Sequence, residues 1–417
     1  MHKTISSITF FFPYHEVSGV PVLFSRMAKH INTHCGITTN VIDYPDGFMA
    51  RTLSDTDVCV RHLVDGVSLH VTEETILVMQ AGFPYEFPPE LVIDDNCRIV
   101  YWVLHPLNLV PAFISRNILG YPRLHKFFLS TVLRPLTMRL ANMISNMVAQ
   151  KSLFFMDGST YSMTTERIGV KISNPIYLPV PSEDVTNDPI LKSLRPQDTI
   201  NFCWVGRLCD FKVYILLHMI GKLLRLANAD QCITLHIIGD GPEAKQVRDA
   251  AQDSEFFKII MLGTLSPSQV EDYLMEKVDV VASMGTSALE AARLGIPTIL
   301  LDYSYTPIQG DYVFKWLFER TGYTLADRIT SDYCKAGNDS LSIMFKQLKC
   351  EYEDITKKTF NYFVVNHSLS SVAVQFVTLL GETNFKFCMF NNKFLHKGLF
   401  RRGYDLSKAI YYSVKGT

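Results

Sequence analysis

The chain has 417 residues, and 47% of them are hydrophobic, which is enough apolar material to fill two buried cores. The chain has 40 Lys and Arg against 41 Asp and Glu, which gives a formal charge of −1. This net charge excludes nucleic-acid binding through a strongly positive overall field. Nine cysteines, an odd number without any C-x-x-C pair, exclude a complete disulfide framework and favour a reducing cytoplasm.

The first predicted element is a strand at residues 8–12. The N-terminus imitates a signal peptide, but its apolar run is short and continues into Pro13 and Glu16 without a small-residue cleavage site. No segment of the chain approaches the roughly 18 consecutive apolar residues of a membrane-spanning helix. The loop at 15–19 then leads into an amphipathic helix, so Gly19 stands at a strand-to-helix turn. It is either a ligand-facing glycine or an ordinary turn glycine.

A second informative strand is expected at 99–104, where a continuous apolar run suits the centre of a parallel sheet. This strand delivers His105 to its carboxyl end, the edge at which open parallel sheets bind ligands. We therefore expect His105 to face a cleft, against the alternative that it caps a neighbouring loop.

Two segments combine basic and large apolar side chains. Between Asp95 and Asp157 no acidic residue occurs, and the tail alternates Lys or Arg with Phe. Segments 98–151 and 385–402 therefore predict attachment to an anionic membrane surface. The alternative is that their apolar residues fill a domain core while the charges are solvated. The basic residues are Arg98, Arg116, Arg123, Lys126, Arg134, Arg139, Lys151, Lys386, Lys393, Lys397, Arg401 and Arg402.

The second half of the chain follows a Pro-rich and polar interdomain linker, assigned to 183–199. Apolar runs then alternate with helical stretches, which predicts parallel βα units and a doubly wound sheet. Ser266, Pro267 and Gln269 predict a capping box at the start of one of these helices. The expected strands are 200–203, 234–239, 257–263, 278–283 and 298–302.

Two cations stand on the loop after the first of these strands. Gly206 opens the turn, and Arg207 and Lys212 follow it. A planar guanidinium fork and an ammonium suit a diphosphate, although a solvated surface loop would look the same. Later, Gly241 offers close backbone approach to a ligand.

Another strand-to-helix turn, formed by Gly285, Thr286 and Ser287, opens the helix that carries Glu290. Its backbone N–H groups and hydroxyls suit phosphate oxygens, and a plain N-cap is the alternative.

Four pieces of this half stand in an order that resembles the C-terminal half of GT-B glycosyltransferases, closest to the retaining family 4 group. They are Gly206-Arg207 with Lys212, residues 238–243, Leu262-Gly263 and residues 287–297. The resemblance implies an α/β protein with two Rossmann-like, doubly wound parallel-sheet lobes that face a central cleft. The implied parts are an acceptor-side lobe at 1–182, a nucleotide-sugar lobe at 200–369, and a helix and basic-aromatic tail at 370–417 that returns to the first lobe.

The resemblance also implies residue roles. Arg207 and Lys212 would hold the donor diphosphate, Glu290 the ribose hydroxyls and His105 the donor sugar. The family usually has a further glutamate eight positions before Glu290, and Ala282 stands there instead, which leaves the donor sugar and the retaining outcome open. The remaining candidate donor-binding residues are Gly19, Gly206, Gly241, Leu262, Gly285, Thr286 and Ser287.

The predicted function is a metal-independent, retaining hexosyltransferase without a cofactor. Its donor would be a UDP- or GDP-linked sugar and its acceptor a glycan or lipid-linked glycan of bacterial lipopolysaccharide, O-antigen or capsule synthesis. We expect it in the cytoplasm or at the cytoplasmic face of the inner membrane, without a nucleic-acid partner. An inverting enzyme would need a general base, for which Glu16 and His105 are candidates.

Two other functions stay open. They are a nucleotide-sugar 2-epimerase of the same fold and a non-catalytic scaffold in a polysaccharide assembly complex. A dehydrogenase is disfavoured, because Gly239-Asp240-Gly241 lacks the third glycine of the dinucleotide fingerprint.

Overall fold

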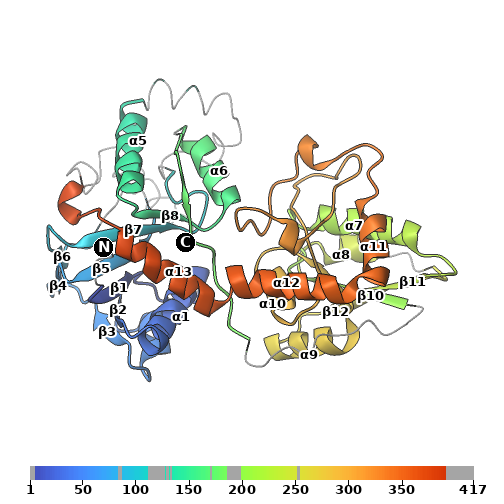
Figure 1. The fold of residues 1–417 in the computed structure, drawn as a ribbon, viewed down its shortest axis with the longest axis horizontal. Coiled ribbons are helices and arrows are strands. Elements are labelled where there is room, and N and C mark those ends of the chain that lie inside the picture. The colour runs from blue at the N-terminus through green and yellow to red at the C-terminus, as the bar shows by residue number, and fades with distance from the viewer. Residues whose placement is uncertain are drawn as a thin grey trace, which may run out of the picture. The chain divides into compact units, whose positions relative to one another are not determined.

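The computed structural model describes residues 5–82, 87–110, 127, 131, 134–169, 171–185, 199–250 and 254–390. The chain divides into two units (Figure 1). The first contains the described residues up to Val180 and those from Val372 onward, and the second runs from Pro181 to Ser371.

The first unit is built on a seven-stranded parallel sheet in the order β3-β2-β1-β5-β7-β8-β9. The order reverses between β1 and β5, so the loop after β1 lies at the switch point of the sheet. The strands are β1 (Ser7–Phe11), β2 (Thr38–Asp43), β3 (Cys59–His62), β5 (Thr75–Gln80), β7 (Arg98–Val103), β8 (Leu153–Phe155) and β9 (Ile176–Tyr177), beside a separate parallel pair, β4 (Leu69–Val71) and β6 (Leu91–Ile93).

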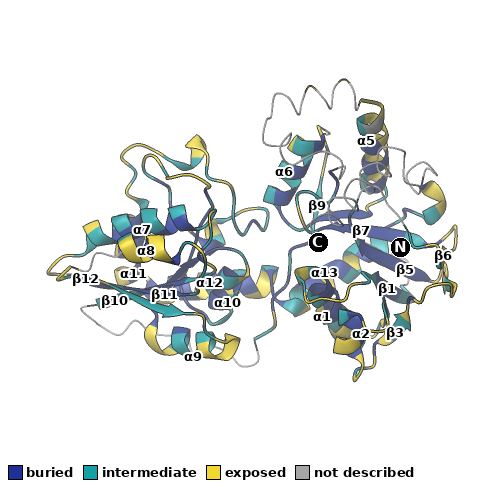
Figure 2. Cartoon of the chain, turned by 180° about the vertical axis from the view of Figure 1, so that it is seen from behind, coloured by how far each residue is buried: buried dark blue, intermediate teal, exposed yellow. Residues whose placement is uncertain are grey.

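Helices cover the sheet of the first unit, which explains its continuous apolar strands. In β7, every residue from Ile99 to Val103 is buried, and Figure 2 shows the sheet in the colour of buried residues. The ring of Phe376 stacks on those of Phe10 and Trp102, with centroid distances of 5.8 and 5.9 Å. The helices are α1 (Gly19–His34), α2 (Phe48–Leu53), α5 (Arg134–Ala149), α6 (Gly158–Ile168) and α13 (Leu369–Glu382), followed by the 3-10 turn η3 (Phe387–Met389).

The second unit contains a six-stranded sheet in the order β12-β11-β10-β13-β14-β15, parallel except for β15. Its switch point lies between β10 and β13. The strands are β10 (Thr199–Val205), β11 (Cys232–Ile238), β12 (Phe257–Gly263), β13 (Val280–Ser283), β14 (Thr298–Leu300) and β15 (Lys315–Trp316). The doubly wound α/β architecture predicted from the sequence is therefore confirmed in both units.

Helices lie on both faces of this second sheet. Phe202 of β10 packs into a core with α7 and α8, whereas the next residue, Cys203, packs into a core with α9. Alternate residues of a strand point to opposite faces, so α7 and α8 cover one face and α9 covers the other. The helices are α7 (Val213–Leu226), α8 (Ala244–Ala250), α9 (Pro267–Lys277), α10 (Thr286–Arg293), α11 (Ser340–Cys350) and α12 (Tyr352–Asn366), with 3-10 turns η1 (Leu317–Glu319) and η2 (Ser331–Tyr333).

Helix α9 begins as the sequence predicts. The Ser266 side chain accepts a hydrogen bond from Gln269 N, the Gln269 side chain accepts one from Ser266 N, and Pro267 occupies the first turn. This reciprocal cap satisfies two backbone donors that a helix N-terminus would otherwise leave unpaired.

Candidate functional site

Three loops of the second unit are joined backbone to backbone beyond the ends of their strands. Gly206 N donates to Ile238 O at 3.0 Å, Leu208 N donates to Asp240 O at 3.0 Å, and Gly239 N donates to Gly263 O at 2.7 Å. These bonds extend the ladder of β10, β11 and β12 into the loops. They fix the backbone of the loop that carries both predicted cations.

This close approach of the loops requires glycine at two positions. A β-carbon on Gly239 would stand 2.1 Å from Gly206 O, and one on Gly241 would stand 2.2 Å from Leu208 O. Gly239 also has a φ of +129° and Gly241 one of +158°, which other residues rarely adopt. The sequence predicts that Gly241 admits a donor, and the structure shows that its immediate neighbour is the Leu208 backbone.

Lys212 is the N-cap residue of α7, and its ammonium turns back toward Gly206. The Nζ atom lies 3.6 Å from the position that a β-carbon on Gly206 would take and 5.8 Å from the centroid of the Phe211 ring. Across the described ranges, no carboxylate lies within 4 Å of Nζ. Burial lowers the pKa of Lys212. Lys212 is therefore a partly desolvated cation that has no fixed counter-ion among the described residues.

Arg207 is exposed on the same loop, directly after Gly206. Both predicted cations thus lie where β10 meets the switch point of the sheet, an edge at which doubly wound proteins bind ligands. A guanidinium and an ammonium held on one backbone can bind a diphosphate with a planar fork and a point charge.

Glu290 lies on α10, the helix after β13, and β13 is the neighbour of β10 in the sheet. One of its carboxylate oxygens accepts a hydrogen bond from Ser182 Oγ, and the other lies 3.0 Å from Arg293 Nε. Arg293 also contacts Glu271, at 2.8 Å. Each carboxylate oxygen of Glu290 thus has a fixed partner. The carboxylate still reaches solvent, because the side chain is 43% exposed.

The turn before α10 is open around Gly285. Gly285 has a φ of +67°, and a β-carbon there would meet no heavy atom within 4 Å. Its N–H donates to Leu325 O at 2.9 Å, while Thr286 is exposed and Ser287 half-buried. Leu262, at the end of β12, packs against the apolar core under α9.

Position 282 carries no side chain that could reach a sugar. Ala282 is fully buried in β13, within the core that faces α7. A carboxylate at this position would be buried among apolar side chains. In the part of the chain that the structure describes, no three His, Cys, Asp or Glu side chains gather to hold a metal ion.

In the first unit, His105 follows β7 and is exposed, at the strand end where the sequence places it. Its backbone N–H and that of Leu104 donate to Asn108 Oδ1, at 2.8 and 3.0 Å. Leu107 N donates to His105 Nδ1 at 3.1 Å, so the neutral ring carries its proton on Nε2. Gly19 is the first residue of α1, with open space around its α-carbon.

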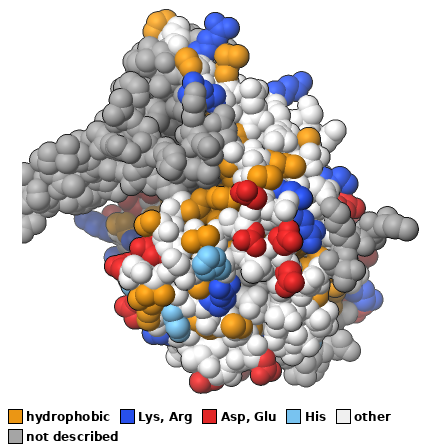
Figure 3. All heavy atoms as spheres, turned by 90° about the vertical axis from the view of Figure 1, so that its left-hand side faces the viewer, with side chains coloured by type: hydrophobic (Ala, Val, Ile, Leu, Met, Phe, Trp, Pro, Cys, Tyr) orange, Lys and Arg blue, Asp and Glu red, His pale blue; other side chains and the backbone are white. Residues whose placement is uncertain are grey.

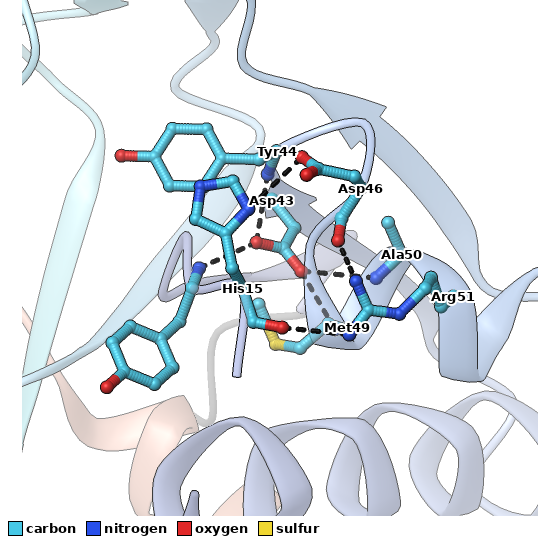
Figure 4. A network of polar contacts seen from close by, with 8 residues as sticks. His15, Asp43, Tyr44, Asp46, Met49, Ala50 and Arg51 are labelled. Atoms are coloured by element: carbon cyan, nitrogen blue, oxygen red, sulfur yellow. Dashed lines mark hydrogen bonds and ion pairs between the residues drawn. The ribbon is translucent and has the colours of Figure 1, made fainter. Parts of the chain in front are cut away.

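A polar network that the sequence interpretation missed holds the loop before Gly19 (Figure 4). The fully buried Asp43 carboxylate accepts backbone hydrogen bonds from residues 14, 44, 49 and 50, at 2.8–3.2 Å. Arg51 donates to His15 O at 2.8 Å, and the His15 ring stacks on Tyr44 at 4.6 Å and contacts Asp46 at 3.1 Å. Asp43 at a strand end, shortly before Gly47, was the available sequence signal.

The described part of the basic-aromatic tail belongs to the core of the first unit. Phe385 and Phe390 are buried, and their ring centroids are 5.0 Å apart. Lys386 contacts Asn96 Oδ1 at 2.7 Å, and Lys151 pairs with Glu382 at 2.7 Å. For Phe385 and Phe390 the core interpretation is correct. Arg116, Arg123, Lys126, Lys393, Lys397, Arg401 and Arg402 lie outside the described residues.

Helix α5 has exposed basic side chains near its start. Arg134, Met138 and Arg139 are exposed, and the helix contains no acidic residue. Figure 3 shows basic and apolar side chains together at the top of the first unit, the height at which Figure 1 draws α5. None of the described helices is both long and apolar enough to span a bilayer.

Comparisons with known proteins give matches among solved structures. No protein-family model and no curated protein matches the chain. A glycosyltransferase from Rickettsia africae matches with a TM-score of 0.52 at 12% identity, over 91% of this chain and 99% of its own. HepE from Anabaena, solved with UDP and glucose, has a TM-score of 0.45 at 12% identity, with coverages of 90% and 99%. WaaG, a glycosyltransferase of lipopolysaccharide biosynthesis, has a TM-score of 0.45 at 12% identity, with coverages of 88% and 98%.

At 12% identity the Rickettsia match shows the fold alone, and it extends over nearly the full length of both chains. Each of the two units has the doubly wound sheet that this fold requires. The chain therefore has the GT-B fold, with two Rossmann-like lobes.

Proposed function

We propose that this protein is a glycosyltransferase that moves a sugar from a nucleoside diphosphate donor to a glycan or lipid-linked acceptor. The carrying observation is the Lys212 ammonium, which is partly buried beside Gly206 and has no carboxylate within 4 Å among the described residues. Keeping such a cation desolvated costs stability, and a bound anion would compensate for that cost.

In the proposed reaction, the bond between the sugar and the diphosphate breaks, and negative charge develops on the leaving diphosphate. Lys212 and Arg207 neutralise this charge, and Glu290 accepts hydrogen bonds from the ribose hydroxyls. Losing one positioned group of this kind costs on the order of 10²–10³ in rate. The proposal includes a retaining outcome without a metal ion, in which no dedicated base is required. His105 would donate a hydrogen bond from Nε2 to the reacting sugar.

The acceptor part of the proposal is a surface polysaccharide precursor of a bacterium, met at the cytoplasmic face of the membrane. It is supported by the exposed side chains of Arg134, Met138 and Arg139 on α5, and by the basic residues after position 390 in the sequence. Deleting the tail would remove the buried Phe385 and Phe390, so charge substitutions are the better test. Arg134→Gln with Arg139→Gln is expected to reduce flotation with anionic liposomes, and unchanged flotation contradicts membrane attachment through α5.

Calorimetric titration with UDP and with GDP tests the donor site. We expect one of the two to bind the wild-type protein, and Lys212→Met to weaken that binding at least tenfold. Lys277→Met is the matched control. Lys277 is an exposed lysine and the last residue of α9, and this helix leads to the start of β13, at the other end of the strands from Lys212. Binding of neither nucleotide, or equal losses in the two variants, would contradict the proposal and favour a non-catalytic scaffold.

A further inference from the structure

Beside Lys212, three aromatic rings and one cation form a surface that we call the aromatic platform: Phe211, Tyr303, Tyr305 and Arg328. The ring centroids of Phe211 and Tyr303 are 5.8 Å apart, those of Phe211 and Tyr305 are 6.1 Å apart, and those of Tyr303 and Tyr305 are 5.9 Å apart. Arg328 Cζ lies 6.0 Å from the centroid of the Tyr305 ring. All of these residues belong to the second unit.

The platform is held rigidly. Ser304 N donates to Phe211 O at 3.0 Å, which ties the loop after β14 to the loop that carries Lys212. Below it, the fully buried Asp302 carboxylate pairs with Arg320 and accepts hydrogen bonds from the Tyr312 hydroxyl at 2.7 Å and from Asp327 N at 2.8 Å. A surface fixed in this way binds a ligand without a large ordering cost.

The platform is also accessible. Tyr305 is 53% exposed, which is high for a large aromatic side chain, and Arg328 is exposed as well. Lys212 Nζ is 5.8 Å from the Phe211 centroid. A ligand whose phosphate meets Lys212 therefore has its neighbouring group within reach of these rings.

The two faces of the sheet indicate which end of the donor meets the platform. Tyr303 packs against the core under α7, whereas Glu290 lies on α10, whose buried residues pack in separate clusters on the other face. Lys212 stands between them at the switch point. If Glu290 holds the ribose and Lys212 the diphosphate, the donor runs toward the α7 face, and its transferred sugar arrives at the platform.

We infer that the aromatic platform binds the transferred hexose of the donor. A pyranose ring has an apolar face of C–H groups that packs on Tyr305, and Arg328 offers N–H donors to its hydroxyls. Such a contact supplies the sugar binding that Ala282, buried in the core, does not provide. This inference rests on the proposed function and names the substrate end that the platform selects.

The test compares nucleoside diphosphates with their sugar conjugates. Wild-type protein is titrated with UDP, GDP and a panel of UDP- and GDP-hexoses, and the conjugate that binds more tightly than its parent nucleotide is selected. Tyr305→Ala is expected to weaken the conjugate about three- to tenfold and to leave the parent nucleotide unchanged. Tyr305→Phe retains the ring and is expected to bind both as the wild type does.

Three outcomes would overturn the inference and leave the diphosphate site intact: no hexose adds affinity to its nucleotide, Tyr305→Ala binds the conjugate normally, or it weakens conjugate and nucleotide equally. A wild-type protein that binds neither UDP nor GDP overturns the proposed function instead, and the platform inference falls with it. Equal melting temperatures of the variants exclude unfolding as the cause of any loss.

Discussion

Gly239 and Gly206 meet backbone to backbone, and a β-carbon on Gly239 would stand 2.1 Å from the Gly206 carbonyl oxygen. Because Gly239 has no side chain, the loop that carries Arg207 and Lys212 can pack directly against it, and this contact positions the loop. The loop of the proposed diphosphate site is thus held in place by residues that need not touch a ligand.

The first prediction follows from this contact. Gly239→Ala should destabilise the protein by about 2–4 kcal/mol, because it adds a backbone clash to an unfavourable positive φ. Urea unfolding of the full chain measures the effect. Gly221→Ala is the control, since Gly221 lies inside α7 and its β-carbon would meet only the end of Arg225 at 3.9 Å. It should stabilise by about 0.5–1 kcal/mol. Equal stability of the two variants would contradict the assigned role of Gly239.

The second prediction concerns the buried charge of Lys212. Burial lowers its pKa from 10.5, so folding disfavours the protonated form, and Lys212→Met should make the ligand-free protein more stable at neutral pH. Below the lowered pKa, the buried ammonium destabilises the folded protein by its full amount. As pH rises from that pKa to 10.5, the unfolded chain holds more protons than the folded one, so the wild type gains stability relative to the variant. Thermal unfolding between pH 7 and 11 measures this, and a difference that widens with pH would refute it.

The third prediction separates the two ends of the nucleotide at Glu290. Glu290→Gln should weaken binding of the nucleoside diphosphate about tenfold, because a charged acceptor of the ribose hydroxyls is lost. Inorganic pyrophosphate lacks a ribose, so its binding should be unchanged. Competition calorimetry measures both, with Glu271→Gln as the control that perturbs the same Arg293. A parallel loss for both ligands would place Glu290 in a structural role only.

The fourth prediction concerns the loop before Gly19. Asp43→Asn should destabilise the protein by about 2–4 kcal/mol, because one amide oxygen replaces two charged acceptors of buried N–H groups. Amide exchange at Tyr14 and Met49 should accelerate, since both donate to Asp43. Asp46→Asn removes an exposed carboxylate and should leave these amides protected. Unchanged exchange at Tyr14 in the Asp43→Asn protein would contradict the role of Asp43 in holding this loop.

Much of the fold could be predicted because its signals are local. The apolar run at 257–263 is β12 with the same bounds, and the Ser266 capping box opens α9 as its residue pattern predicts. The loop of Arg207 and Lys212 was found because a strand, a glycine and two cations stand in a short stretch. The position of this loop at the end of β10 is confirmed, and its binding of a diphosphate stays a prediction.

The remaining features depend on contacts between distant segments. Nothing near Phe211 in the sequence indicates that Tyr303 and Tyr305 return to it, because a hydrogen bond between loops about 90 residues apart makes that contact. The close approach of Gly241 to the Leu208 backbone could not be predicted for the same reason. For Phe385 and Phe390, the alternation of basic and aromatic residues describes a buried core segment equally well.

The most direct test of the account is a crystal structure of the protein grown with whichever of UDP or GDP it binds. We expect the diphosphate within hydrogen-bonding distance of Lys212 Nζ and of the Arg207 guanidinium, at the end of β10. A nucleotide bound elsewhere, with Lys212 still facing Gly206 and no phosphate near it, would contradict the central claim.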